Sequence, residues 1–384
     1  MATAQNAGKA NSIDSSEKKK FWNNDTEAII GIMVVLLILG TINVFSSSFI
    51  IAEAEFDSPY FFLKRHLINI VIGFIAFGIC FRVDYHKWRG LMPFVLLFTL
   101  LALILVLIIG PEVNGAKRWL PLGVAQFQPA EFAKLVAIMI MAAYLAMQVK
   151  ANREIKFFTP QLGIIGVMAF LTEQEPDMGT ASIILRIPLI MMVVAGLHWK
   201  KVLQLVGVGF LGIIALIYRQ PYRLERLKVT WDPWSDAQNF GYQTVQSLSA
   251  IGSGELTGMG LGVGVSKYDY LPEAHTDFAF AIFCQENGFL GAIFVFLLFA
   301  ALTVYAARVA SRARDEYGQI LSMGIMILIV GQAVANLLMV GGMLPVVGVP
   351  LPFISYGGTS LIVTMASIGI LANIGRLGVK SAEN

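Results

Sequence analysis

Long apolar runs separated by short polar stretches make up most of the chain. A membrane-spanning helix needs about 20 mainly apolar residues to cross ~30 Å of hydrocarbon. Ten segments fit, although the fifth is short and the eighth can be started earlier: residues 27–51, 61–81, 91–109, 129–149, 159–173, 179–197, 202–218, 278–301, 318–340 and 357–374. The pattern predicts an all-α polytopic membrane protein with about ten transmembrane helices, and an even number places both termini on one side.

The distribution of Lys and Arg sets the orientation. With the N-terminus in the cytoplasm, the cytoplasmic segments hold most of these residues, beginning with Lys18, Lys19 and Lys20. The short loops of the other side hold little beyond Lys64, Arg65, Lys117 and Arg118. Cytoplasmic loops of membrane proteins carry this positive excess, whereas long loops cross largely regardless of charge. We therefore expect both termini in the cytoplasm and residues 219–277 to form one long extracytoplasmic loop.

Domain organisation follows from the same pattern. Residues 1–25 are polar and predict a disordered cytoplasmic tail, residues 26–375 a single transmembrane domain, and residues 376–384 a second cytoplasmic tail. The first apolar run is longer than that of a cleaved signal peptide, so we expect it to be retained as a span.

Composition excludes several classes of protein. Apolar residues make up 57% of the chain and charged residues 14%, against ~25% in soluble domains, and the mean hydropathy is +0.70. A net charge of +3 gives no basic field for nucleic acid. Cys80 and Cys284 lie in apolar runs, which indicates buried thiols, and the four histidines are too scattered for a zinc site.

Charged residues at membrane depth are costly and are therefore functional candidates. The first cluster holds Lys117 and Arg118, followed by Glu131 and Lys134 three residues apart on one helical face, where the two can form an ion pair. One interpretation is an internal ion pair that locks the helix to a neighbour. The other is an anion site in which Lys117, Arg118 and Lys134 face a phosphate-bearing ligand.

The second cluster gathers Glu173, Glu175 and Asp177 between two spans. Pro176 and Gly179 interrupt the helix there, and Asp177 is placed to cap the next one. The cluster is either a capped turn or part of a polar cavity, with a divalent cation as one option.

The third cluster, Glu273, His275 and Asp277, ends the long loop where an apolar run resumes. Spacing alone favours Asp277 as a helix N-cap. The alternative is a half-buried carboxylate whose pKa is tuned by its acidic and imidazole neighbours.

Two further stretches are rich in glycine or proline. Residues 252–264 lack the Lys-Ser/Thr ending of a phosphate-binding loop, so we expect a tight, close-packed loop. Pro345, Pro350 and Pro352, followed by Gly357 and Gly358, predict a broken re-entrant segment before the last span.

Six ordered segments resemble the signatures of the SEDS family (shape, elongation, division and sporulation), which includes FtsW, RodA and SpoVE. The resemblance runs through nearly the whole chain after residue 26 and is carried by Asn114–Trp119, Gln128–Glu131, Pro176–Thr180, Gln246–Ser247 with Ala250–Gly254, Leu271–Phe278 and Pro350–Gly358. Where the family usually has Gln-Pro-Asp-Leu-Gly-Thr, this chain has Glu175 and Met178.

The resemblance implies a ten-span enzyme of the bacterial inner membrane that polymerises lipid II into glycan strands and releases undecaprenyl diphosphate. It implies a class B penicillin-binding protein as partner, together with other divisome proteins. The family's catalytic aspartate falls on Asp277 and its important lysine on Lys134. The full set of substrate-binding candidates is Lys117, Arg118, Trp119, Glu131, Lys134, Asp177, Gln246, Ser253, Glu273 and His275.

On this reading Asp277 removes a proton from the acceptor 4-hydroxyl as it attacks C1 of the donor, and a single displacement gives an inverted, β-1,4 linkage. Lys117, Arg118 and Lys134 would offset charge on the departing diphosphate. No cofactor is indicated with certainty. Mg²⁺ or Mn²⁺ stays open, with no aspartate-rich motif to hold it and no metal ligand assigned.

Three questions stay open from the residues. Broken segments and intramembrane charge also suit a lipid II flippase or another transporter, although a carrier needs its charges near mid-membrane. A scaffolding protein would not need an intact Asp277. Ala274 resembles the division-type branch, and hence a role at the septum, more than the elongation-type branch of RodA.

Overall fold

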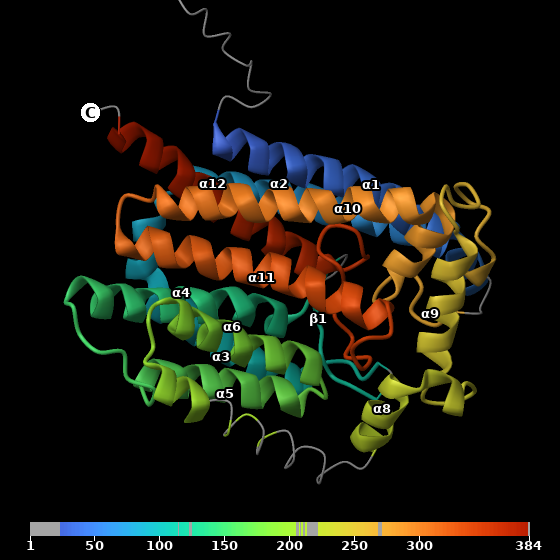
Figure 1. Ribbon diagram of the computed structural model, residues 1–384, viewed down its shortest axis with the longest axis horizontal. Helices are drawn as coiled ribbons and strands as arrows, with labels where there is room; N and C mark the ends of the chain where they lie inside the picture. Colours follow the sequence, from blue (N-terminus) through green and yellow to red (C-terminus); the bar gives the residue numbers. More distant parts are fainter. Residues whose placement is uncertain are drawn as a thin grey trace, which may run out of the picture.

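The computed structural model describes residues 24–382 except 114, 123–124, 205–206, 208, 210–211, 213–221 and 268–270. Long helices run side by side along the molecule (Figure 1). They are α1 (Asp25–Phe56), α2 (Phe61–Arg82), α3 (Tyr85–Ile109), α4 (Pro129–Lys150), α5 (Pro160–Gln174), α6 (Met178–Val194), α10 (Ala279–Ser311), α11 (Glu316–Val340) and α12 (Gly358–Ala382).

Short elements gather at the end of the bundle away from the C-terminus, which we call the loop end (Figure 1). An antiparallel hairpin pairs Leu120 of β1 (Leu120–Leu122) with Phe127 of β2 (Ala125–Phe127). The long loop contains the remaining short elements, which are α8 (Tyr222–Trp231), the 3-10 turn η1 (Pro233–Asp236), α9 (Tyr242–Ser253) and the 3-10 turn η2 (Val265–Lys267). The sequence pattern did not predict the hairpin or these helices.

The predicted all-α class is confirmed, and nine of the ten predicted spans coincide with helices. The remaining one, 202–218, lies mostly outside the described residues. Seven of the described helices are long and apolar enough to cross a membrane, whereas α5 and α6 are shorter, at 15 and 17 residues.

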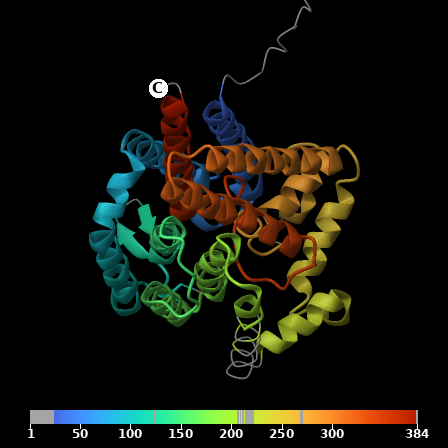
Figure 2. The same cartoon turned by 60° about the vertical axis from the view of Figure 1, so that its left-hand side comes forward.

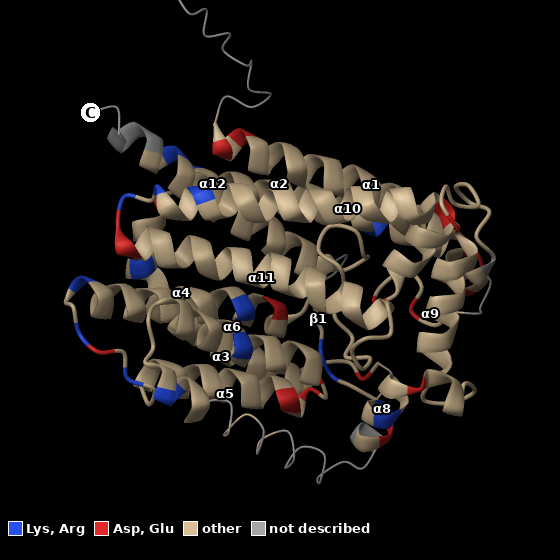
Figure 3. Ribbon diagram, in the orientation of Figure 1, with Lys and Arg blue, Asp and Glu red and all other residues tan. Residues whose placement is uncertain are grey.

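Burial separates central from peripheral helices. In the most apolar stretch of α4 and of α12, 72% of residues are buried, against 17% in α2 and 22% in α3. The turned view places the teal α3 at the outer edge of the bundle (Figure 2). Most charged residues lie near the helix ends, and a few blue and red bands also lie near the middle of the view, around α4 and α6 (Figure 3). Exposed apolar side chains on the outer helices are what a surface in contact with lipid requires.

A break in α10 shapes the loop end. Gly288 has φ 65° and ψ −168°, which interrupts the helical hydrogen bonds. The glycine-rich loop supplies the missing partners: Glu255 and Leu256 accept from the N–H groups of residues 289 and 290 at 2.9 and 3.1 Å. Backbone groups at membrane depth must be satisfied within the protein. The predicted close-packed loop is therefore observed, and it completes the hydrogen bonding of α10.

The proline-containing stretch before α12 is also irregular, as the sequence predicted. Residues 341–357 contain no helix or strand, yet Val349, Leu351, Phe353 and Ile354 are buried. The stretch enters the bundle at the loop end and forms one wall of the site described next.

Candidate active site

A cavity of about 410 Å³ opens at the loop end. The first turns of α4, α6 and α12 border it, together with residues of α2 and the stretches that precede α10 and α12. Its Lys, Arg, Asp and Glu lining residues are Arg65, Arg118, Glu131, Asp177, Glu273 and Asp277. Three clusters that are far apart in the sequence thus meet in one place.

Asp277 lies half-buried in the cavity wall. Phe278 is the N-cap of α10 and makes no side-chain cap hydrogen bond, so the helix-cap interpretation of Asp277 does not hold. Among the described residues, no group hydrogen-bonds to its carboxylate. Burial, and then the negative charges of Glu273 and Asp177, raise the pKa of Asp277 to about 7, while Arg118 opposes the rise. The carboxylate is thus free to accept a proton near neutral pH.

Asp177 caps α6 as predicted, because its Oδ1 accepts the Thr180 N–H at 3.0 Å. Its other oxygen accepts a hydrogen bond from the Gln128 side chain at 3.1 Å. Burial raises the pKa of Asp177, and the Arg118 guanidinium works against that rise. Asp177 therefore links two cavity walls through its two oxygens.

Glu175 is fully buried next to this cap. Neither of its carboxylate oxygens has a hydrogen-bond partner among the described residues. Burial, with a contribution from Asp177, raises the pKa of Glu175 to about 9. Arg118 donates to the backbone carbonyls of Glu175, at 3.2 Å, and Pro176. Glu175 is therefore neutral at pH 7. The Arg118 guanidinium hydrogen-bonds to backbone carbonyls and not to a carboxylate.

The predicted pair of Glu131 and Lys134 forms beneath the cavity. Lys134 Nζ lies 2.8 Å from the Glu131 carboxylate and 2.9 Å from Gln332 Oε1. Glu131 reaches the cavity, whereas Lys134 is 3% exposed and is not part of the lining. Lys134 therefore connects Glu131 of α4 to Gln332 of α11 below the cavity and does not face the open space.

The other candidates divide in two. Trp119 and Glu273 line the cavity. Lys117, Gln246, Ser253 and His275 do not: Ser253 bonds to Gln285 at 2.8 Å, and His275 packs against Phe62 and Tyr356. The structure thus brings Arg118, Trp119, Glu131, Asp177, Glu273 and Asp277 together.

Sequence reasoning missed two buried amides of α11. Gln332 accepts from Lys134 and donates to the Pro350 carbonyl at 3.0 Å, and Asn336 donates to the carbonyls of Asp277 and Val349 at 2.8 and 2.7 Å. They are four positions apart, so they share one face of an apolar helix. That spacing of polar residues in a span was the signal available.

The cavity does not have the ligand set of a metal site. Within the described part of the chain, no three His, Cys, Asp or Glu side chains are placed to hold a metal ion. We therefore derive no step that depends on Mg²⁺ or Mn²⁺.

The sequence of the chain was compared with those of known proteins, and it matches one family. A family model described as cell cycle protein (FtsW, RodA and SpoVE) matches residues 27–378. The chain is 39% identical over 344 residues to a "Probable peptidoglycan glycosyltransferase FtsW" of Geobacter sp. (strain M18), covering 89% of this chain and 94% of that protein. It is 38% identical over 348 residues to "Stage V sporulation protein E" of Bacillus subtilis (strain 168), covering 90% and 95%.

A solved structure has the same fold over nearly the whole length. It is described as "Structural coordination of polymerization and crosslinking by a peptidoglycan synthase complex". The TM-score is 0.74 at 26% identity, and the match covers 91% of this chain and 97% of that one.

Proposed function

The chain belongs to the FtsW, RodA and SpoVE family of cell cycle proteins, and we propose from this that it is a peptidoglycan glycosyltransferase that polymerises lipid II. It is a multi-pass membrane protein. The observation that carries the proposal is the carboxylate of Asp277, which has no hydrogen-bond partner among the described residues and lies in a cavity that also holds Arg118. The relatives named as FtsW support the division-type branch and a role in the septal wall.

The chemistry assigned to Asp277 is general base catalysis. A base works best when its pKa is close to the operating pH, because it is then both ionised and basic enough to take a proton. The pKa of Asp277, raised to about 7, meets this requirement. Asp277 would take the proton of the acceptor 4-hydroxyl while that oxygen attacks C1 of the donor. The C1–diphosphate bond breaks, the undecaprenyl diphosphate leaves, and C1 is inverted.

Arg118 is the group best placed to offset charge on the departing diphosphate. It lines the cavity, and its hydrogen bonds to described residues go to neutral backbone carbonyls. Lys134 is committed to Glu131 and Gln332, so we assign it to the shape of the floor. Trp119 and Glu273, both in the lining, would contact the sugars.

The cavity lies at one end of the bundle, near the long loop. A carrier exposes its binding site alternately to both sides from near the middle of the membrane. The Lys and Arg asymmetry supports the loop end as extracytoplasmic, where lipid II presents its sugars. A polymerase therefore fits better than a flippase.

A crosslinking partner is part of the same proposal. The solved structure with this fold belongs to a peptidoglycan synthase complex in which polymerization and crosslinking are coordinated. That likeness supports a crosslinking partner for this chain, which we take to be a class B penicillin-binding protein. We also expect other divisome proteins to bind at the septum.

The test is polymerisation of labelled lipid II by the purified full-length protein, with and without its transpeptidase partner. Asp277→Asn should lower the rate by at least about 100-fold, the usual contribution of a positioned base. Asp315→Asn, which changes a carboxyl near the opposite helix ends, is the control and should keep its rate. A folded Asp277→Asn variant that still makes glycan would refute the assignment. Lipid II flipping in vesicles without glycan synthesis would favour the transporter.

A further inference from the structure

Asp277 is held in place by its backbone. Its carboxylate has no hydrogen-bond partner among the described residues, so the position of that carboxylate depends on what fixes residue 277 of the main chain. The Nδ2 atom of Asn336, on α11, donates to the Asp277 carbonyl at 2.8 Å. Asn336 is fully buried, so water does not compete for this bond.

The same amide group holds the opposite wall. Asn336 Nδ2 also donates to the Val349 carbonyl at 2.7 Å. Gly348, just before Val349, has φ +67°, and a Cβ built there would lie 3.3 Å from Asp277 Oδ2. The two N–H bonds of a single amide thus fix both the base and the wall against which its carboxylate lies.

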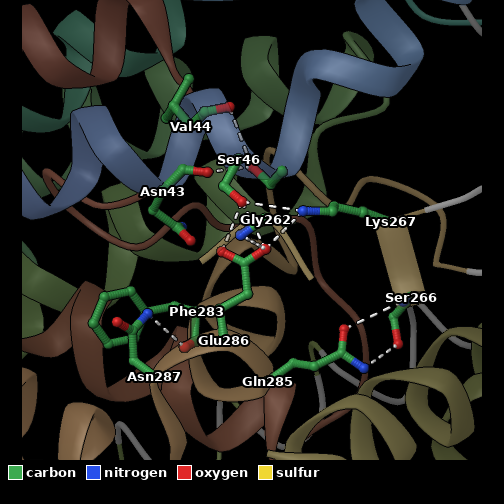
Figure 4. A network of polar contacts seen from close by, with 11 residues as sticks. Asn43, Val44, Ser46, Gly262, Ser266, Lys267, Phe283, Gln285, Glu286 and Asn287 are labelled. Atoms are coloured by element: carbon green, nitrogen blue, oxygen red, sulfur yellow. Dashed lines mark hydrogen bonds and ion pairs between the residues drawn. The ribbon is translucent and has the colours of Figure 1, made fainter. Parts of the chain in front are cut away.

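A second asparagine, on α1, hydrogen-bonds to the backbone at the start of α10. Asn43 of α1 donates to the Ala279 carbonyl at 3.0 Å. Behind it, the Glu286 carboxylate accepts from Ser46 at 2.6 Å and from Lys267 at 2.7 Å (Figure 4). Gly262 N–H donates to the same carboxylate at 3.1 Å. The start of α10 is therefore tied to α1 and to the glycine-rich loop, while residue 277 itself is tied to α11.

We propose that Asn336 is a positioning residue for Asp277: its side-chain amide sets where the catalytic carboxylate lies relative to the cavity wall at Gly348 and Val349. This inference rests on the proposed function. A carbonyl that loses its buried donor moves to find another partner, because a buried carbonyl without a hydrogen bond is costly. A displacement of ~1 Å at a reacting group can cost about 100-fold in rate.

The chain offers a matched control. Asn373 of α12 is also a fully buried asparagine, and it bridges helices by donating to the Phe81 carbonyl at 2.7 Å and accepting from Tyr85 N–H at 3.1 Å. It belongs to the opposite end of the bundle from Asp277. Asn336→Ala and Asn373→Ala therefore remove the same group from equally buried sites, and only the first touches Asp277.

The measurement is lipid II polymerisation as a function of substrate concentration, per folded molecule of full-length protein. Asn336→Ala should lower kcat by about 10- to 100-fold with KM changed by less than about twofold, since the binding groups of the cavity remain. Asn373→Ala should lose thermal stability to a similar degree and keep kcat. Equal kcat values in the two variants would overturn the proposal.

Asn336→Asp adds a readout that a purely structural role would not move, and it carries the comparison if the alanine variant does not fold. The introduced side chain keeps the shape of asparagine. Protonated, it can donate to one of the two carbonyls, whereas ionised it repels both. We expect kcat to fall with rising pH through a descending limb that the native protein lacks. A pH profile of unchanged shape would overturn the proposal.

Failure of the proposed function looks different. If Asp277→Asn still polymerises lipid II, the base assignment is wrong whatever Asn336 does. If Asp277→Asn is inactive while Asn336→Ala has native kcat, Asp277 keeps its role and only the positioning role of Asn336 is refuted.

Discussion

Asp277 and Glu273 are four residues apart in the cavity wall, and their charges act on each other. Burial and the Glu273 charge both raise the pKa of Asp277, whose value of about 7 places its titration in the physiological range. A general base must be deprotonated to act. The rate of polymerisation should therefore rise with pH through a limb near pH 7.

Replacing Glu273 tests the origin of that limb. Glu273→Gln removes a negative neighbour, so the pKa of Asp277 falls and the acid limb of the rate moves to lower pH. The initial rate of lipid II polymerisation between pH 5 and 9 measures the shift. Glu225→Gln, on the exposed face of α8, is the control and should leave the limb in place. A limb that stays put in Glu273→Gln would show that the two charges are not coupled.

Glu175 gives a prediction about stability. Its pKa is about 9 in the folded protein and 4.5 when exposed, so between these values the unfolded state binds fewer protons than the folded one. The free energy of unfolding therefore falls as pH rises from about 4.5 to about 9. Glu175→Gln removes this pH-dependent loss, so the stability advantage of the variant over the native protein should be larger at pH 8 than at pH 5.

Thermal melting of the detergent-solubilised protein at several pH values measures this gain. The advantage of Glu175→Gln should shrink as the pH falls below about 4.5, where the native carboxyl is protonated in both the folded and the unfolded state. An advantage of constant size across the range would mean that the substitution acts through packing and not through ionisation.

At single residues, local geometry was predictable and distant partners were not. The Asp177 cap and the pair of Glu131 and Lys134 were predicted because they connect residues three apart on one helix. The surroundings of the Asp277 carboxylate are formed by α4, α6, α11 and the stretch before α12. These elements are far apart in the sequence, so residue spacing could not predict that they meet there. Glu175 could be recognised as a departure from the family pattern, but its complete burial could not.

The broken helix α10 and the glycine-rich loop form one hydrogen-bonded unit. Gly258, in that loop, has φ +84°, and a Cβ there would lie 2.1 Å from the Glu286 carbonyl oxygen. This glycine is required twice, by its backbone conformation and by the contact. Glu286 leads into the break at Gly288, so the loop determines the course of α10 at that break.

Gly262 separates these two requirements, because its φ is +81° and no atom would lie within 4 Å of an added Cβ. Gly262→Ala carries only the backbone cost, about 1–2 kcal/mol. Gly258→Ala adds a backbone clash and should lose at least about 2 kcal/mol more. Yield of folded protein and melting temperature, measured side by side, test the difference. Similar losses in the two variants would mean that the loop is not packed against α10 as described.

Whole elements were predictable where hydropathy alone defines them. The apolar runs located the long helices because burial in lipid requires about 20 residues of apolar surface. Hydropathy does not detect short elements that do not cross the membrane. The β1–β2 hairpin, α8 and α9 were therefore not predicted. Gln332 and Asn336 were overlooked for a related reason: two amides hardly change the mean hydropathy of α11.

The molecule as a whole has two unlike ends. The loop end holds the cavity and α8 to α9, whereas the opposite end holds basic residues such as Lys150, the last residue of α4, and Arg153, in the connection that follows. Polymerisation of lipid II requires the cavity to face the side where the sugars lie. The proposed function therefore requires the orientation that the Lys and Arg distribution predicts. If that orientation is wrong, the proposed function is wrong as well.

Single cysteines test that orientation directly, because the native Cys80 and Cys284 are free and buried and so give little background labelling. Ser235→Cys lies in η1 and Ala151→Cys just after α4, and both positions are exposed. In intact spheroplasts a membrane-impermeant maleimide should label Ser235→Cys at once, since its loop faces outward. Ala151→Cys should be labelled only after the membrane is permeabilised. The reverse pattern would place the cavity in the cytoplasm, where a polymerase of exported lipid II could not use it.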